Sequence, residues 1–165
     1  MIRLAQPEDG DSIAAITAEV GVFSPSEIQC VAELWNEYLK QGEKSGYTFL
    51  AFHDGGRTLG YACFGPHPLA EGVWDLYWIA VDPAAHGQGV GRALLHQVED
   101  IVSAQQGRLI LVETSGTPAY EPARRFYESC GYRYQAVIHD FYASGDDLII
   151  FGKTLRPVPA AVCAA

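Results

Sequence analysis

The chain has 165 residues, the size of one ordinary domain and enough to bury a hydrophobic core. Hydrophobic residues make up 48% and charged residues 19%, which excludes a disordered or collagen-like chain. Twenty acidic against eleven basic residues give a formal net charge of −9, so the chain lacks the positive surface that binding to nucleic acid or to an anionic membrane requires. Any anionic ligand must therefore be held locally.

The predicted elements run in the order β-α-α-β-β-β-α-β-α-β-β, read from periodicity and turn residues. In the first half, we expect a strand at Ile2–Leu4, helices over Asp9–Val20 and from Ser24 to near Gly42, and strands over Tyr47–His53, Thr58–Phe64 and Val73–Val81. In the second half, we expect a helix over Gly89–Gln105, a strand over Leu109–Val112, a helix over Glu121–Cys130, and strands over Tyr132–Tyr142 and Leu148–Leu155. The strand–helix–strand order in the middle implies a parallel crossover within a mixed sheet. A single domain over 1–156 and a flexible tail over 157–165 are expected.

Two stretches carry specific local signals. In Ser24-Pro25-Ser26-Glu27, the serine can cap a helix, the proline suits its first position and the glutamate can close a capping box. Asp54-Gly55-Gly56-Arg57 lies between two β-rich runs and indicates a hairpin turn.

The cysteines and histidines give no sign of a metal or a disulfide framework. The four cysteines lie far apart without a C-x-x-C pair, and the five histidines show no metal-ligand spacing, so no metal is expected. No apolar run approaches the ~18 residues that a transmembrane helix needs. Acidic residues stand near the N-terminus where a signal peptide would have its apolar stretch. These features predict a cytoplasmic protein with reduced thiols.

Glycines at alternate positions follow the strand that ends at Val81, in His86-Gly87-Gln88-Gly89-Val90-Gly91, and lead straight into a helix. Glycine tolerates positive φ, and the first amides of a helix lack internal acceptors and carry the positive end of its dipole. The stretch therefore predicts an anion site suited to a pyrophosphate. It is no Walker loop, which needs Gly-Lys-Ser/Thr, and Arg92 stands where a dinucleotide fingerprint needs its last glycine. A glycine-rich connector without a ligand is the alternative.

This stretch resembles the acyl-CoA signature Arg/Gln-x-x-Gly-x-Gly/Ala of the GNAT superfamily of acyl-CoA-dependent N-acetyltransferases, with His86 where Arg or Gln is usual. A second stretch is similar to the family's Asn-x-x-Ala-x-x-Phe-Tyr-x-x-x-Gly-Phe helix at Ala123, Phe126, Tyr127 and Gly131. It departs at Tyr120, where Asn is usual, so an amide contact to the cofactor arm is not carried over. The element order also matches. The resemblance implies an α+β fold, an α/β/α sandwich whose mixed, mostly antiparallel sheet of about seven strands contains a splayed parallel pair and is accompanied by four helices.

The resemblance also implies acetyl-CoA (coenzyme A) as co-substrate, bound without a metal. The cofactor-binding residues that it implies are Ile79, Ala80 and Val81 through their backbone, His86, Gly87, Gln88, Gly89, Val90, Gly91, Arg92 and Ala93 in the turn, and Tyr120, Ala123, Phe126 and Tyr127.

Three residues are expected to carry the chemistry. A phenol with a pKa of ~10 stays protonated at neutral pH, so Tyr127 is expected to act as the general acid toward the departing CoA thiolate. The alternative is that Tyr127 packs beside Phe126 with its hydroxyl bonded to backbone. Asp75 matches the strand position where histone-type members carry a base glutamate, although an exposed strand-end carboxylate is an equal reading. Glu113, at the end of the next strand, is the other candidate base, and a water chain is a third.

The family selects its substrate with the first two helices and the last hairpin. The predicted substrate-lining aromatics are Phe23, Trp35, Tyr77 and Tyr142, and acidic residues accompany them. An acidic, aromatic-lined cleft suits a cationic amine. The expected function is therefore transfer of an acetyl group from acetyl-CoA to a primary amine of a small molecule or peptide, by direct attack in a ternary complex. The alternatives are a non-catalytic acyl-CoA-binding sensor and a transferase of another acyl group or to a hydroxyl. Edge strands and the apolar tail leave a homodimer open.

Overall fold

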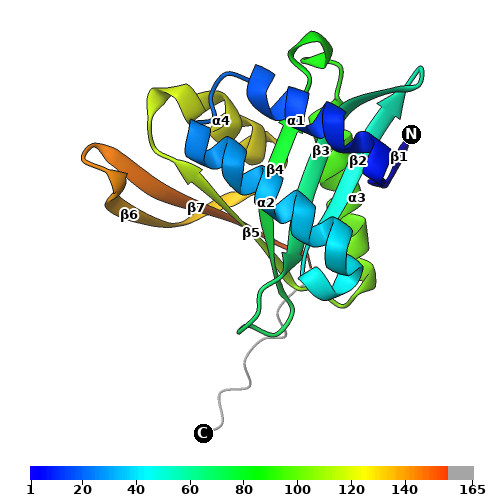
Figure 1. Ribbon diagram of the computed structural model, residues 1–165. Coiled ribbons are helices and arrows are strands. Elements are labelled where there is room, and N and C mark those ends of the chain that lie inside the picture. The colour runs from blue at the N-terminus through cyan, green and yellow to red at the C-terminus, as the bar shows by residue number, and fades with distance from the viewer. Residues whose placement is uncertain (156–165) are drawn as a thin grey trace, which may run out of the picture.

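The computed structural model describes residues 1–155, in which one open, twisted sheet is covered on one face by α1 and α2 and on the other by α3 and α4 (Figure 1). The strands, in their order across the sheet, are β1 (Ile2–Leu4), β2 (Thr48–Asp54), β3 (Arg57–Pro66), β4 (Val73–Val81), β5 (Leu109–Ser115), β7 (Asp146–Thr154) and β6 (Arg133–Ala143). The helices are α1 (Gly10–Glu19), α2 (Pro25–Gln41), α3 (Val90–Ala104) and α4 (Glu121–Ser129). Short 3-10 turns, which the sequence did not predict, are η1 (Pro7–Asp9), η2 (Gly42–Ser45), η3 (Pro83–Ala85) and η4 (Pro118–Tyr120). The predicted seven-stranded mixed sheet with four helices is thus confirmed.

The local signals act as the sequence predicts. The hydroxyl of Ser24 accepts the Glu27 N–H at 3.3 Å, and the Glu27 carboxylate accepts the Ser24 N–H at 2.8 Å, which completes the capping box of α2. Gly55 and Gly56 both adopt positive φ in the β2–β3 turn, the conformation that such two-residue hairpins require.

Most helix and strand boundaries differ from the prediction by one or two residues, and two of the differences have a clear physical reason. Helix α3 begins at Val90, because Gly89 takes a left-handed φ of +82° and stands outside the helix as its N-cap. Strand β5 runs on to Ser115, beyond the predicted Val112, because its last three residues, which are polar, also pair with β7. The pattern of hydrophobic residues could not show this extension.

The two faces of the sheet hold separate hydrophobic cores. Under α3 and α4, the core contains Leu94, Val98, Ile110 and Phe151 among others. Under α1 and α2, aromatic residues dominate, and Trp35 contacts the rings of Tyr38 and Phe49. Both faces of the central strands are therefore buried, which explains their continuous apolar runs.

Strands β4 and β5 are the only parallel neighbours in the described part of the sheet, and they part halfway along. Their pairing covers Val73–Leu76 with Leu109–Val112 and then stops. On β3, Cys63 pairs with Trp78 while Phe64 pairs with Leu76, so Tyr77 is an extra residue on β4. Such a bulge bends its strand. Beyond it, β4 stays with β3 and β5 stays with β7, which leaves an opening between them.

Outer strand β6 is exposed along all its length and irregular near its end. Its pairing with β7 is lost between Ile138 and Ala143, where Asp140 has a φ of +53°. Within residues 1–155, no helix is long and apolar enough to cross a membrane. The predicted tail, 157–165, lies outside the described residues, and the homodimer stays a prediction.

Candidate active site

The turn between β4 and α3 presents a row of backbone N–H groups without acceptors. The first hydrogen bond of α3 runs from the Ala93 N–H to the Gly89 carbonyl at 2.9 Å, so the N–H groups of Gly89–Arg92 precede it. The N–H of Gly87 has no acceptor within the described residues either. Gly87 and Gly89 have φ values of +76° and +82°, which turn these amides to one side at positions where other residues would be strained. Five such donors at a helix N-terminus are suited to hold an anion such as a diphosphate.

The side chains of this turn fold back on the turn itself. The ring Nε2 of His86 lies 3.0 Å from the Val81 carbonyl oxygen, and the Gln88 amide donates to the Ala84 carbonyl at 3.1 Å. The side chains of His86 and Gln88, which were expected to bind the cofactor, therefore bond to the backbone of their own loop. The replacement of the usual Arg or Gln by His86 leaves the row of amides intact.

Helix α4 packs directly against the start of α3. A Cβ at Gly91 would stand 3.5 Å from both the Phe126 ring and the Val81 side chain, an ordinary van der Waals contact, so these side chains lie directly beside Gly91. The guanidinium of Arg92 donates to the carbonyl and hydroxyl of Ser129, at 3.3 and 3.0 Å. Phe126 thus packs against the first turn of α3 at Gly91, and Ala123 lies half-buried on the same helix as Phe126. The side chain of Arg92 thus ties the start of α3 to the end of α4 through two of its five N–H donors.

Beyond the bulge, the N–H and carbonyl groups of successive β4 residues point alternately toward β3 and toward the opening. The Asp82 N–H bonds the Leu59 carbonyl at 2.9 Å, and backbone groups alternate in an antiparallel pair. Ala80 therefore directs its N–H and carbonyl toward β3, whereas Ile79 and Val81 direct theirs into the opening. The expectation that Ala80 binds the cofactor through its backbone is wrong, because β3 already occupies those groups.

Tyr127 lies inside the core that α4 shares with the sheet. Its side chain is 7% exposed, and its ring contacts those of Phe126, Tyr132 and Phe151. Burial raises the pKa of Tyr127 far above that of a free phenol, which keeps its proton in place. Within the described residues, its hydroxyl has no hydrogen-bonding partner. The structure therefore shows the predicted packing beside Phe126 but leaves the phenolic proton free to be donated.

Asp75 and Glu113 lie on the same face of the sheet, at the point where β4 and β5 part. Asp75 is opposite Leu111 in the parallel register, and Glu113 is two residues further along β5. Burial raises the pKa of Asp75 against an opposing contribution from His67, and burial and then the charge of Asp75 raise the pKa of Glu113. Neither carboxylate makes a hydrogen bond or ion pair within residues 1–155. Two unpaired carboxylates with raised pKa values are suited to accept protons.

Three of the four predicted substrate-lining aromatics lie around this opening. Phe23 packs edge-on against Trp78 at 5.2 Å, and Tyr77 packs edge-on against Tyr47 at 5.4 Å. Tyr142 is exposed on the last hairpin. Burial, followed by the charges of Glu113, Asp146 and Glu27, raises the pKa of Tyr142 to about 12.

Trp35 does not line the opening. Its side chain is 9% exposed and belongs to the core under α2, where it packs on the sheet. The amphipathic pattern of α2 places Trp35 one turn after buried Val31 on the inward face. Its assignment to the substrate site is therefore wrong.

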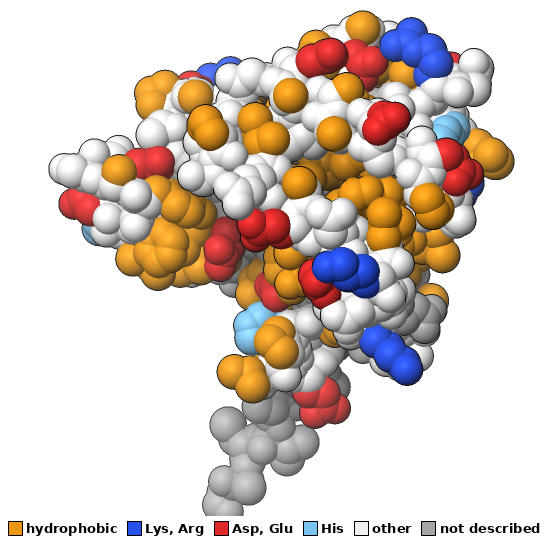
Figure 2. Space-filling model, in the orientation of Figure 1, with side chains coloured by type: hydrophobic (Ala, Val, Ile, Leu, Met, Phe, Trp, Pro, Cys, Tyr) orange, Lys and Arg blue, Asp and Glu red, His pale blue; other side chains and the backbone are white. Residues whose placement is uncertain are grey.

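One pair of residues near the opening was missed by sequence reasoning. The Tyr120 hydroxyl donates to Glu27 at 2.6 Å and lies 3.3 Å from the Val22 carbonyl oxygen. Tyr120, expected to bind the cofactor, thus directs its hydroxyl to the start of α2. Figure 2 shows acidic side chains beside the hollow between the β6–β7 hairpin and the rest of the molecule. Glu27, Glu113 and Asp146 lie close enough to Tyr142 for their charges to raise its pKa. The guanidinium of nearby Arg124 donates to the Ser115 and Thr117 carbonyls.

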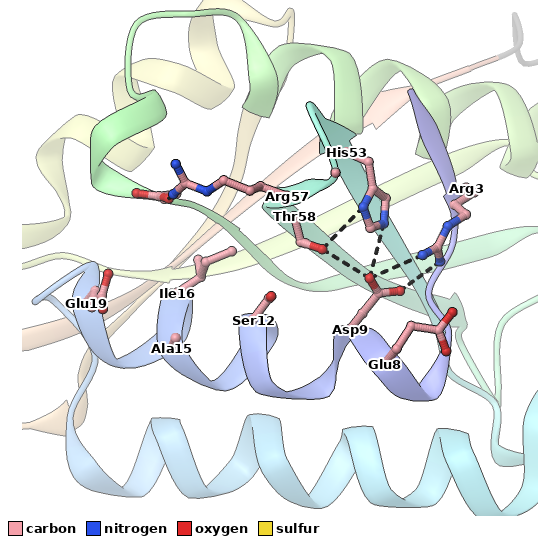
Figure 3. Close-up of a pocket in the computed structure, with 12 residues that line it drawn as sticks. Arg3, Glu8, Asp9, Ser12, Ala15, Ile16, Glu19, His53, Arg57 and Thr58 are labelled. Carbon is pink, nitrogen blue, oxygen red and sulfur yellow. Dashed lines mark hydrogen bonds and ion pairs between the residues drawn. The ribbon is translucent and has the colours of Figure 1, made fainter.

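A polar groove of about 550 Å³ lies elsewhere, between α1 and the β2–β3 turn (Figure 3). Near its centre, the buried Asp9 carboxylate contacts Arg3 at 2.8 Å, Thr58 at 3.0 Å and His53 at 3.1 Å. The Gln6 N–H and the Arg3 guanidinium lower the pKa of Asp9 against the effect of burial. This network ties the N-terminal strand to the hairpin and needs no ligand. Within residues 1–155, no group of three or more His, Cys, Asp or Glu is placed to hold a metal ion.

Known proteins share both the sequence and the fold. Residues 15–132 match the Acetyltransferase (GNAT) family. A protein of the GNAT family from Desulfovibrio desulfuricans, known from its crystal structure, is 41% identical, with a TM-score of 0.91 over 94% of this chain and 99% of that chain. The mycothiol acetyltransferase of Thermomonospora curvata is 36% identical over 93 residues, which are 54% of this chain, and this match spans 28% of that enzyme's length. An aminoglycoside 6′-N-acetyltransferase complexed with coenzyme A shares the fold, with a TM-score of 0.75 and 19% identity over 96% of this chain and 99% of that chain.

Proposed function

The chain belongs to the GNAT acetyltransferase family and is an acetyl-CoA-dependent acyltransferase, and we propose that it acetylates a primary amine of a small molecule or peptide by direct attack in a ternary complex. The observation that carries this proposal is a single arrangement along β4. Five unpaired N–H groups stand at its end, and unpaired carboxylates stand where it parts from β5.

The residues present fit acetyl-CoA. The N–H groups of Gly87 and Gly89–Arg92 would hold its diphosphate, which explains how a protein of net charge −9 binds a polyanion. The free backbone groups of Ile79 and Val81 would pair with the amides of the pantetheine arm along the opening. Because the thioester is then fixed relative to β4, the acceptor can attack it without a covalent enzyme intermediate. When bound, acetyl-CoA supplies the activated acetyl group.

The acceptor must lose a proton before it can attack. A lysine-like amine with a pKa of ~10.4 pays roughly 4.6 kcal/mol to be neutral at pH 7. Asp75 and Glu113 have raised pKa values and no ion pair within residues 1–155, so either can take this proton, directly or through water. As the new C–N bond forms, the amine nitrogen loses its second proton to water, and as the C–S bond breaks, Tyr127 donates its proton to the sulfur and regains one from solvent. The negative charges near Tyr142 would attract the cationic form of the amine to the site.

Release of free thiol from acetyl-CoA in the presence of an amine panel tests this function. We expect release that depends on one or more cationic primary amines. A sensor would bind acetyl-CoA without releasing thiol, and a transferase of another acyl group would prefer that thioester to acetyl-CoA. Absence of both binding and release would refute the proposal.

A further inference from the structure

The connection between α1 and α2 spans the opening between β4 and β5. On the β4 side, the ring of Phe23 packs on Trp78, which lies beyond Leu76, the last residue that pairs with β5. On the other side, the Val22 carbonyl and the Glu27 carboxylate accept hydrogen bonds from the Tyr120 hydroxyl. Tyr120 follows β5 in the chain and is the N-cap residue of α4. Figure 1 shows the first turn of α2 beside α4. The segment Val22–Glu27 is therefore anchored on both sides of the opening.

The contact between Tyr120 and Glu27 is the stronger anchor. It is 2.6 Å long, joins residues 93 positions apart and has a charged acceptor. The other oxygen of Glu27 accepts the Ser24 N–H at 2.8 Å, so one carboxylate both caps α2 and ties it to α4. Burial and the bond to Glu27 raise the pKa of Tyr120, which keeps the phenol in its donor form.

This geometry gives Tyr120 a role that differs from cofactor contact. Its hydroxyl is committed to α2 and to the Val22 carbonyl, so the group that it offers beside the cofactor arm is its ring alone. We propose that Tyr120 is a positioning residue for the acceptor: through Glu27 it holds the segment Val22–Glu27 across the opening as one wall of the amine site. This inference rests on the proposed function, because the amine site is part of it.

Removal of the hydroxyl should loosen this wall and weaken acceptor binding while the diphosphate turn stays intact. For Tyr120→Phe, we expect the KM for the amine to rise roughly tenfold, which corresponds to about 1.4 kcal/mol, with the Kd for coenzyme A changed less than about twofold. Glu27→Gln keeps one acceptor oxygen for the Ser24 N–H, and its amide NH2 can donate to the Tyr120 oxygen, so its amine KM should rise less than that of Tyr120→Phe. Tyr134→Phe, which removes an exposed hydroxyl on β6, is the matched control and should change neither constant.

The experiment measures thiol release against amine and acetyl-CoA concentration, calorimetric binding of coenzyme A, and the Tm of each variant. A raised amine KM with unchanged coenzyme A affinity supports the positioning role. Weakened coenzyme A binding with an unchanged amine KM would show that Tyr120 contacts the cofactor and would overturn the inference, as would no change in either constant. Failure of the proposed function is distinguishable, because then the unmodified protein releases no thiol with any amine.

Discussion

Tyr127→Phe separates catalysis from stability at a single atom. The variant removes one hydroxyl from a ring packed among Phe126, Tyr132 and Phe151 and leaves those ring contacts in place. Because that hydroxyl makes no hydrogen bond within the described residues, its loss should change the free energy of unfolding by less than about 1 kcal/mol. The same loss removes the proposed general acid, a group that contributes roughly 10²- to 10⁴-fold to rate. We therefore expect kcat to fall at least about 100-fold while Tm and coenzyme A affinity hardly move.

Tyr61→Phe is the matched control for this prediction. Tyr61 is also buried, but its hydroxyl lies 2.8 Å from that of Thr17, within the core under α1. Its loss should cost about 1 kcal/mol of stability and leave kcat unchanged. Denaturant unfolding gives the stability of both variants, and thiol release gives their turnover. Unchanged turnover in Tyr127→Phe would remove that residue from its role, and a stability loss as large as that of Tyr61→Phe would show that its hydroxyl is bonded.

Two further predictions concern the turn and the carboxylates. Gly89→Ala places a side chain at a φ of +82°, at a cost of about 1–2 kcal/mol, and should weaken coenzyme A binding at least tenfold by disordering the amides. Gly145→Ala, at a φ of +83° in the last hairpin, should show the same loss of stability with unchanged coenzyme A affinity, and equal weakening in both variants would count against the turn as the anion site. Partial desolvation, and then the charge of Asp75, raise the folded-state pKa of Glu113 above its unfolded value although the side chain is exposed, so its charge opposes folding slightly at neutral pH, and this penalty fades as the pH falls through the raised pKa. Glu113→Gln should accordingly raise Tm at pH 7 but not below the ordinary glutamate pKa of about 4.3, and should lower thiol release, whereas a lower Tm at pH 7 would contradict the reasoning.

Much of the fold was predictable because local chemistry decides it. The capping box at Ser24 fixes the start of α2, and paired glycines fix the β2–β3 turn, without help from distant residues. The alternate glycines likewise predict the proposed anion site, since positive φ and a free helix start are properties of the local chain.

The site beyond the turn depends on tertiary contacts that the sequence pattern does not contain. Trp35 was assigned to the substrate site because a helix pattern does not say which neighbour covers its apolar face. The backbone direction of Ala80 depends on register with β3, and that register is shifted at Tyr77 by a bulge with no sequence signal. The hydrogen bond between Tyr120 and Glu27 joins residues that are 93 positions apart, and only the folded structure shows that they are close in space.

The most direct test is a titration of the isotope-labelled protein with coenzyme A, followed by the shift of each backbone amide resonance. The account predicts that Gly87 and Gly89–Arg92 move most, because their N–H groups bond the diphosphate, while amides around Asp9 and His53 in the polar groove stay where they are. Binding that shifts the groove and leaves the turn unmoved would contradict it.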